Sequence, residues 1–216
     1  MSLRDLLEAE VARVWATQTD GAHDVWHLRR VWAQCQSIAD AVDQRTDRDV
    51  LLAGSYLHDI VNLPKNHPQR ARAAALSAEH AVAFLAPLGW SEPRLNMVAH
   101  AIESHSFSAG VTCTTIEAEV LQDADRLEAL GAIGIARCFN VSGQLGGALF
   151  DGGDPRAADR ALDDRAYALD HFEVKLYKIA ETLNTAPARA IAAQRVAFMR
   201  GFANQLVSEL GDPSQM

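Results

Sequence analysis

Histidine and aspartate residues that could hold a metal ion occur in three separate segments of the chain. His58 is followed directly by Asp59, and it falls on the apolar face of a segment with helical periodicity that begins near Asp47. A buried imidazole beside a buried carboxylate is costly unless a partner compensates for the lost water. Neutral imidazole and carboxylate are both good ligands for first-row divalent ions, so this pair predicts a metal centre.

Two further segments carry residues that could complete this centre. His27 lies at the edge of an apolar helical face, one turn before Val31, and Asp123 and Asp125 lie among apolar residues in LQDADRLEALGAIG. Residues two positions apart point in different directions on a helix, so only one aspartate is expected to ligate the ion. Periodicity leaves both open: Asp123 lies nearer the large apolar residues, and Asp125 lies on a face of small residues. Four ligands would leave coordination positions for water or substrate, as in catalytic sites.

The elements that position these residues are predicted to be helices. Apolar residues recur at steps of three and four, and alternating strand patterns are absent. Helices are expected over about 3–15, 24–43, 47–61, 69–85, 91–103 and 114–139, with two or three more over 158–210. Thr114 and Glu117 form a capping-box pattern for the long helix. We therefore expect an all-α single domain over 1–216, with its core over about 20–140, a glycine-rich loop inserted after residue 140 and C-terminal helices packing on the core.

The composition narrows the functional classes. The 216 residues carry a formal net charge of −8, which argues against a nucleic acid polymer as partner but not against a small phosphorylated substrate. No apolar run is long enough to cross a membrane, and the acidic N-terminal stretch does not resemble a secretory signal. Three widely separated cysteines do not suggest a disulfide framework. We expect a cytoplasmic protein without a membrane partner, and the oligomeric state cannot be predicted from the sequence.

The order His, His-Asp, Asp on helices resembles the HD-domain superfamily of metal-dependent phosphohydrolases. Five stretches carry the resemblance over about residues 20–205, namely HDVWHLRRVW, LLAGSYLHDIVNLPK, IESHSFS, LQDADRLEALGAIGIAR and DHFEVKL. They are similar to a bacterial branch that includes nucleotide pyrophosphohydrolases. The resemblance implies an HD-domain-like helical bundle and a divalent ion (Mn, Mg, Co, Ni, Fe or Zn) held by His27, His58, Asp59 and Asp125. Asp125 is favoured as the fourth ligand because related domains place it within an Ala-Asp-(Arg/Lys)-Leu stretch.

Three basic residues are expected to bind phosphate. Arg30 follows His27 by one turn, Lys65 follows the end of the helix that carries the His-Asp pair, and His105 begins the HSFS stretch. Asp59 and Lys65 are expected to take part in catalysis. The predicted reaction is metal-dependent hydrolysis of a small phosphorylated substrate, in particular a nucleotide, by a pyrophosphohydrolase or a phosphomonoesterase.

The residue that accepts the proton of the attacking water is not assigned. Some HD-domain hydrolases carry an acid three or four positions after the Asp of the pair, where this chain has Asn62 and Leu63. Asp59 or Glu103 could take that role. The missing acid keeps open an alternative function, a metal- or nucleotide-binding regulatory module without turnover. A diiron oxygenase would need further ligands, and the sequences around His80, His100 and His105 do not resemble that branch.

Overall fold

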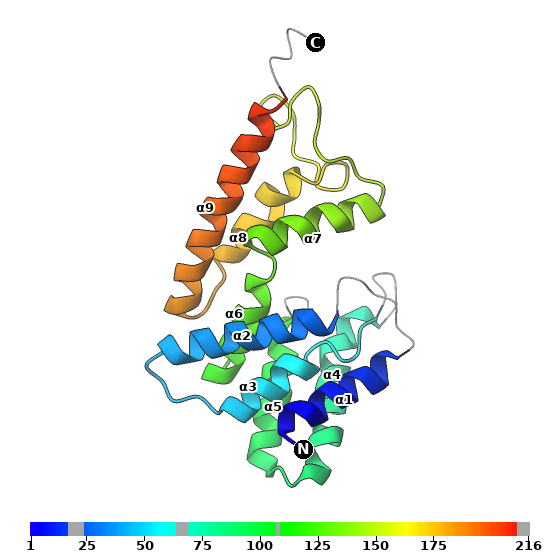
Figure 1. Ribbon diagram of the computed structural model, residues 1–216, viewed down its shortest axis with the longest axis vertical. Coiled ribbons are helices and arrows are strands. Elements are labelled where there is room, and N and C mark those ends of the chain that lie inside the picture. Colours follow the sequence, from blue (N-terminus) through cyan, green and yellow to red (C-terminus); the bar gives the residue numbers. More distant parts are fainter. Residues whose placement is uncertain (17–23, 64–68, 107–108, 211–216) are drawn as a thin grey trace. The chain divides into compact units, whose positions relative to one another are not determined.

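The computed structural model describes residues 1–16, 24–63, 69–106 and 109–210, and these residues are predominantly helical (Figure 1). Within them no β-strand forms, and the only β-type pairing is an isolated bridge between Ala148 and Tyr167. The predicted all-α class is thereby confirmed. The chain divides into two compact units, Met1–Asp125 and Arg126–Met216.

The first unit is built around one short, buried helix. Its elements are α1 (Leu3–Trp15), α2 (Val25–Ala41), α3 (Arg48–Leu57), η1 (Arg70–Arg72), α4 (Ala73–Leu85), η2 (Ala86–Leu88), α5 (Glu92–His105) and α6 (Ile116–Leu127), the last of which extends two residues beyond the unit. All residues of α3 from Val50 to Leu57 are buried, and α3 packs against α1, α2, α4 and α5. The residues that end α3 are therefore surrounded by other helices.

A glycine lets α3 and α6 approach closely. A Cβ atom at Gly54 would lie 2.9 Å from the Leu121 Cδ2 atom. Gly54 precedes His58 by four residues and Leu121 precedes Asp125 by four, so the contact lies one helical turn before each of these residues. The start of α2 is fixed by Asp24, whose carboxylate accepts a hydrogen bond of 2.8 Å from the His27 backbone N–H.

The second unit contains α7 (Gly131–Gln144), the π-helical turn η4 (Phe172–Leu176), α8 (Tyr177–Ala180) and α9 (Ala186–Ser208). An aromatic cluster joins these helices, with the Phe172 ring centroid 6.1 Å from Phe139 and 6.4 Å from Phe202. Residues 145–169, which follow α7, are irregular. Arg160 stabilises this segment through two hydrogen bonds of 2.5 and 2.8 Å to the buried carboxylate of Asp170.

Several predicted helix ends were wrong, each for a local reason. The helix predicted over 114–139 is two helices, because the chain turns after Leu127 and Gly131 takes a φ of 74°, which glycine adopts without steric cost. The helix predicted over 47–61 ends at Leu57, and the one predicted to end at residue 103 continues to His105. The residues from 158 to 169 are irregular rather than helical.

The predicted capping box was also wrong. Thr115, rather than Thr114, receives the hydrogen bond from the Ala118 backbone N–H, at 3.2 Å. Glu117 instead accepts a hydrogen bond of 2.8 Å from the backbone N–H of Asp47. A long-range contact thus replaces the local cap that the spacing suggested.

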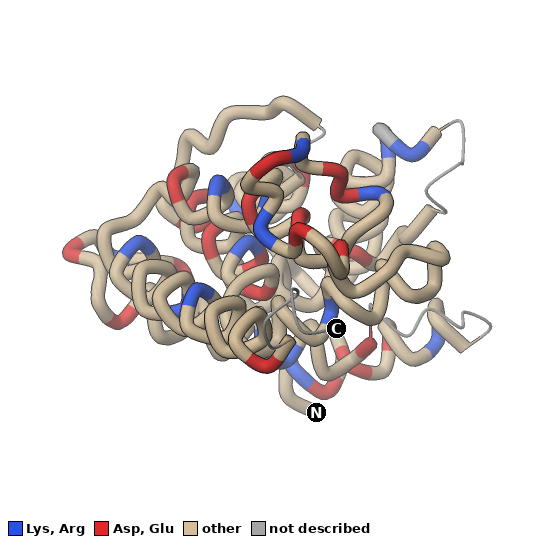
Figure 2. Tube along the Cα trace, turned by 90° about the horizontal axis from the view of Figure 1, so that it is seen from above, with Lys and Arg blue, Asp and Glu red and all other residues tan. Residues whose placement is uncertain are grey.

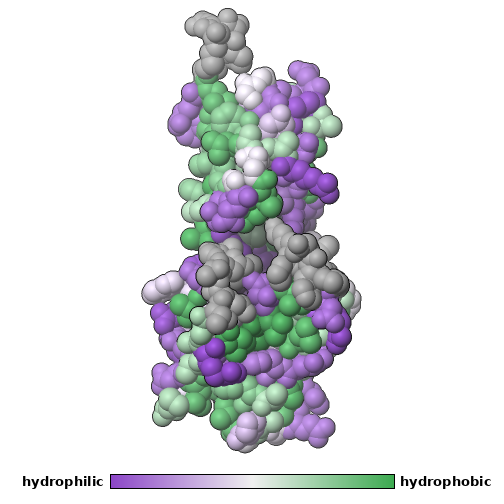
Figure 3. All heavy atoms as spheres, turned by 90° about the vertical axis from the view of Figure 1, so that its right-hand side faces the viewer, coloured by the Kyte–Doolittle hydropathy of each residue, from purple (hydrophilic) through white to green (hydrophobic). Residues whose placement is uncertain are grey.

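The surface carries a mixture of residue types. Basic and acidic residues are interspersed along the chain trace in Figure 2, and Figure 3 shows hydrophilic and apolar residues side by side on the visible face. Within the described residues, none of the helices combines the length and apolar character that crossing a membrane requires.

Candidate metal centre

Five side chains of the first unit converge from four helices. His27 is the third residue of α2, His58 is the C-cap of α3 and is followed by Asp59, His105 is the last residue of α5, and Asp125 lies in the last turn of α6. The early end of α3 matters here, because neighbours within a helix point about 100° apart. At the helix end His58 and Asp59 can turn toward the same place.

His27, His58 and Asp125 bring their donor atoms closest together. The two Nε2 atoms of the histidines lie 3.3 Å apart, and Asp125 Oδ1 lies 3.6 Å from His27 Nε2 and 3.8 Å from His58 Nε2. One ligand atom from each residue lies within 4.8 Å of the others. Two imidazole nitrogens and a carboxylate oxygen at such spacing fit the donor preferences of a first-row divalent ion.

A second group shares His58 with the first. Asp59 Oδ2 lies 3.5 Å from His58 Nε2, and Asp59 Oδ1 lies 3.6 Å from His105 Nε2. His58, Asp59 and His105 also place one donor atom each within 4.8 Å of one another. The Asp59 carboxylate therefore lies between two imidazole rings.

Backbone carbonyl groups orient two of these rings. His58 Nδ1 donates a hydrogen bond of 3.0 Å to the Ser55 carbonyl, and His105 Nδ1 donates one of 2.5 Å to the Ile102 carbonyl. A donating Nδ1–H leaves the Nε2 lone pair of a neutral ring directed into the site, the arrangement found in histidine ligands of metals.

Burial and charge set the protonation of these two histidines differently. Burial lowers the pKa of His58 to about 4, so the ring is neutral at pH 7 and able to donate a lone pair. Burial acts in the same direction on His105, but the Asp59 carboxylate, aided by Asp125, raises the pKa of His105 above its ordinary value. The two rings, whose centroids are 4.9 Å apart, thus have unlike electrostatic roles.

The carboxylates form the open side of the centre. The side chains of His27, His58 and His105 are 1%, 0% and 6% exposed, whereas those of Asp59 and Asp125 are 28% and 29% exposed. The centre therefore contacts solvent through its two aspartates, while the three imidazoles are shielded from water.

Comparison with known proteins identifies a family that agrees with this geometry. Residues 25–130 match the model of the HD domain. The Bacillus subtilis protein YpgQ is 30% identical to this chain over an alignment that covers 96% of each of the two chains. The chain belongs to the HD-domain superfamily of metal-dependent phosphohydrolases.

Solved structures agree with this family. An HD-superfamily hydrolase from Bacillus thuringiensis matches with a TM-score of 0.73 and 29% identity, over 96% of this chain and 98% of that one. The crystal structure of Bacillus subtilis YpgQ in complex with ADP matches with a TM-score of 0.71 and 28% identity, over 95% and 98% of the two chains. These likenesses extend beyond the HD domain itself to nearly the whole chain.

Not all the sequence-predicted residues of this HD-domain protein lie in the converging group. Asp123 is fully buried and belongs to neither donor group, whereas Asp125 belongs to the first. Arg30 is half-buried on α2, and Lys65 lies outside the described residues. Glu103 lies about 200° around α5 from His105, which places it on another face of that helix.

Asn62, at a position where some HD-domain hydrolases have an acid, contacts an arginine. Arg70 of η1 donates hydrogen bonds to Asn62 Oδ1, at 3.3 Å, and to the carbonyl of Leu63. Asn62 thus holds the guanidinium group of Arg70 beside the segment that follows the His-Asp pair. The sequence analysis did not select Arg70, because the partner lies eight positions away across a turn that periodicity does not predict.

The remaining described histidines contact other residues. His80 pairs with Glu10 at 2.7 Å, His171 pairs with Asp164 at 2.8 Å, and His100 Nε2 accepts a hydrogen bond of 3.0 Å from the Thr114 backbone N–H. They hold helices and loops in place, in accord with the interpretation that they are not metal ligands.

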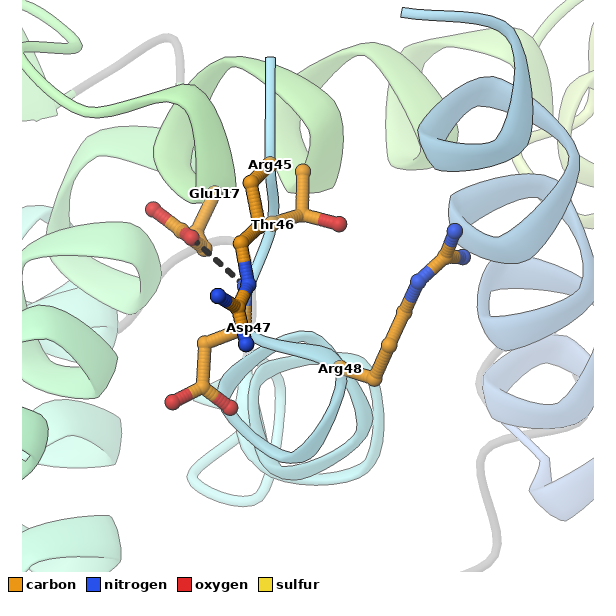
Figure 4. Close-up of a pocket in the computed structure, with 5 residues that line it drawn as sticks. All are labelled: Arg45, Thr46, Asp47, Arg48 and Glu117. Atoms are coloured by element: carbon orange, nitrogen blue, oxygen red, sulfur yellow. Dashed lines mark hydrogen bonds between the residues drawn. The ribbon is translucent and has the colours of Figure 1, made fainter.

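A surface pocket of about 560 Å³ lies at the start of α3 (Figure 4). Figure 4 shows the hydrogen bond from the Asp47 backbone to Glu117 on one side of this pocket and Arg48 extending away on the other. Arg48 pairs with Asp40 at 2.6 Å, and Arg94 makes two hydrogen bonds to Asp47. Three of the lining residues, Asp47, Arg48 and Glu117, are engaged in these structural contacts, and none of the five converging side chains lines the pocket.

Proposed function

We propose that this protein holds a divalent cation through His27, His58, Asp59 and Asp125 and hydrolyses a phosphate ester or anhydride of a nucleotide. The observation that supports it most strongly is the approach of the His27 and His58 Nε2 atoms to 3.3 Å, with Asp125 Oδ1 within 3.8 Å of both. When bound, the ion supplies Lewis-acid polarisation of a phosphoryl oxygen and lowers the pKa of a water molecule.

The residues of the chain take separate parts in this proposal. Asp59 is 28% exposed and lies between His58 and His105. We propose that its carboxylate accepts the proton of the attacking water. His105, whose Nε2 atom lies 3.6 Å from Asp59 Oδ1, is proposed to offset the charge that develops on the phosphoryl group. Arg30 and Lys65 are proposed to bind the phosphates of the substrate.

A nucleotide is the proposed substrate class because a close relative binds one. The crystal structure of Bacillus subtilis YpgQ contains ADP, and that protein matches this chain over 95% of its length. Cleavage of a nucleoside triphosphate to a monophosphate and cleavage of a monophosphate ester are both compatible with the donor set.

The test is metal-dependent turnover. The purified protein is stripped with a chelator, reloaded with Mn, Co, Ni or Mg, and assayed against nucleoside mono-, di- and triphosphates for release of phosphate and of pyrophosphate. Pyrophosphate release from a triphosphate would identify a pyrophosphohydrolase, and phosphate release from a monophosphate would identify a phosphomonoesterase. Absence of both products with every metal would contradict the enzymatic proposal.

The second candidate is a nucleotide-binding regulatory module without turnover. It is favoured by Asn62, which stands where some relatives have an acid and which contacts Arg70 instead. Binding of a nucleotide to the metal-loaded protein, measured by calorimetry, together with no product in the assay above, would establish this alternative.

A further inference from the structure

A large aromatic side chain next to the metal centre is open to solvent. Trp26 is 59% exposed, and it directly precedes His27 in α2. Tryptophan is usually largely buried, and an exposed indole beside a polar site offers a broad apolar surface to a ligand.

The exposed indole is held in place from one side. The guanidinium carbon of Arg29 lies 4.8 Å from the centroid of the Trp26 ring. Arg29 is itself fixed by two hydrogen bonds, of 3.1 and 2.9 Å, to the carboxylate of Glu8. Glu8 also accepts a hydrogen bond of 2.8 Å from the hydroxyl of Tyr56, a fully buried residue. One face of the ring is therefore covered by an anchored cation, and most of the side chain still contacts water.

Helix geometry connects this ring to the phosphate-binding residues. Arg30 follows Trp26 by four positions and His27 by three, so Arg30 neighbours both residues on α2, whereas Trp26 and His27 themselves point about 100° apart. A nucleotide whose phosphates bind at the metal centre and near Arg30 has a base that the ribose holds away from those phosphates, and Trp26 is the exposed aromatic residue next to Arg30 on α2.

We propose that Trp26 stacks against the base of the bound nucleotide. The inference rests on the proposed function of the metal centre and adds the residue that distinguishes a nucleotide from an inorganic phosphate. Stacking on an aromatic ring uses the flat face that every base has, so this contact favours nucleotides without selecting strongly among bases. Ordering of the ring by Arg29 reduces the entropy lost when the base binds.

The chain offers a matched control. Trp90 makes the same kind of pair with Arg94, whose guanidinium carbon lies 4.3 Å from the ring centroid, and Arg94 is anchored by two hydrogen bonds to Asp47. Trp90 precedes α5 and His105 ends it, so at 1.5 Å per residue about 20 Å of helix separates Trp90 from the centre. Loss of Trp90 should not change binding at the centre.

The test compares ligands with and without a base. Dissociation constants of ADP and of inorganic pyrophosphate are measured by calorimetry for the Mn-loaded wild type and for the W26A, W26F and W90A variants. W26A should weaken ADP binding by about 5- to 100-fold and leave pyrophosphate binding unchanged. W26F should recover most of the affinity for ADP, and W90A should match the wild type for both ligands.

Two results would overturn the role of Trp26: unchanged binding of ADP by W26A, or an equal loss for ADP and pyrophosphate. The test measures binding and does not require hydrolysis. The role of Trp26 can therefore be judged even if the protein hydrolyses no nucleotide. If the protein binds ADP without hydrolysing any nucleotide, and only W26A loses affinity for ADP, Trp26 would stack on the base in a regulatory module.

Discussion

The Nε2 atoms of His27 and His58 lie 3.3 Å apart, although 31 positions separate the two residues in the chain. The Nδ1 atom of His58 is already used by the Ser55 carbonyl, so its Nε2 atom presents a lone pair toward His27. Two imidazole nitrogens held this close, with carboxylates beside them, are a donor set that one divalent cation would accept. The packing of α2 against α3 thus brings together two nitrogen atoms that could both bind one cation.

The fourth ligand can be tested by paired substitutions in α6. D125N should weaken Mn²⁺ binding by about 100-fold, because it removes the carboxylate charge from the group containing His27 and His58. D123N should leave Mn²⁺ affinity within about threefold of the wild type, since Asp123 belongs to neither donor group. Metal titration by calorimetry, with circular dichroism to verify folding, measures both effects. Equal losses in two folded variants would contradict the assignment of Asp125.

The role of His105 can be separated from metal binding. H105A should retain Mn²⁺ affinity, because His27, His58, Asp59 and Asp125 all remain. It should lower kcat by about 100-fold, the effect expected when a positioned charge-stabilising group is lost. Steady-state kinetics and metal titration on the same preparation provide the comparison. Loss of the metal from H105A would show instead that His105 is a ligand.

The helical class was predictable because burial of one face of a helix leaves a period of three to four residues in the sequence. Helix ends were less predictable. The break between α6 and α7 depends on the left-handed conformation of Gly131, and the start of α6 depends on a contact between Glu117 and Asp47, which are 70 positions apart. Local spacing does not encode contacts of that range.

The convergence of His27, His58 and Asp125 followed from residue types and from the family resemblance. The choice between Asp123 and Asp125 did not follow from periodicity, since both lie among apolar residues of one helix. His105 was predicted to bind phosphate, but its contact with Asp59 was not specified, because α5 was expected to end two residues earlier. That extra half turn carries His105 to the centre.

The ion pair behind Trp26 should contribute stability that depends on pH. The hydrogen bonds from Arg29, together with those from Tyr56 and Arg4, lower the pKa of Glu8 from 4.5 to about 2, despite an opposing effect of burial. A carboxylate with a depressed folded-state pKa stabilises the fold above pH 4.5, and this contribution is lost as pH falls from 4.5 toward 2.

E8Q should therefore lower the free energy of unfolding by about 1–2 kcal/mol at pH 7, less than the full pKa shift implies because water screens the partly exposed pair. The difference from wild type should shrink below pH 4.5. Urea unfolding followed by circular dichroism at pH 7 and pH 3 tests this. The control is E79Q, since Glu79 is 66% exposed and lies 4.0 Å from Arg72. A difference for E8Q that stays constant down to pH 3 would contradict the linkage.

Two glycines of α7 should respond in opposite directions to alanine. A Cβ atom at Gly134 would fall inside contact distance of the Ala129 backbone carbonyl, which cannot move without disrupting the turn between α6 and α7. G134A should therefore lower the free energy of unfolding by about 2–3 kcal/mol. At Gly143 a Cβ atom would meet nothing within 4 Å, and the helical backbone there favours alanine.

G143A should consequently raise the free energy of unfolding by about 0.5 kcal/mol, because alanine loses less backbone entropy than glycine on entering a helix. Thermal and urea unfolding of both variants beside the wild type measure the two changes under identical conditions. The opposite signs depend only on what lies next to each Cβ position, since the helix and the substitution are the same. A G134A variant as stable as G143A would show that the turn before α7 can move to accept the added Cβ atom. The close approach of Ala129 would then not require glycine at position 134.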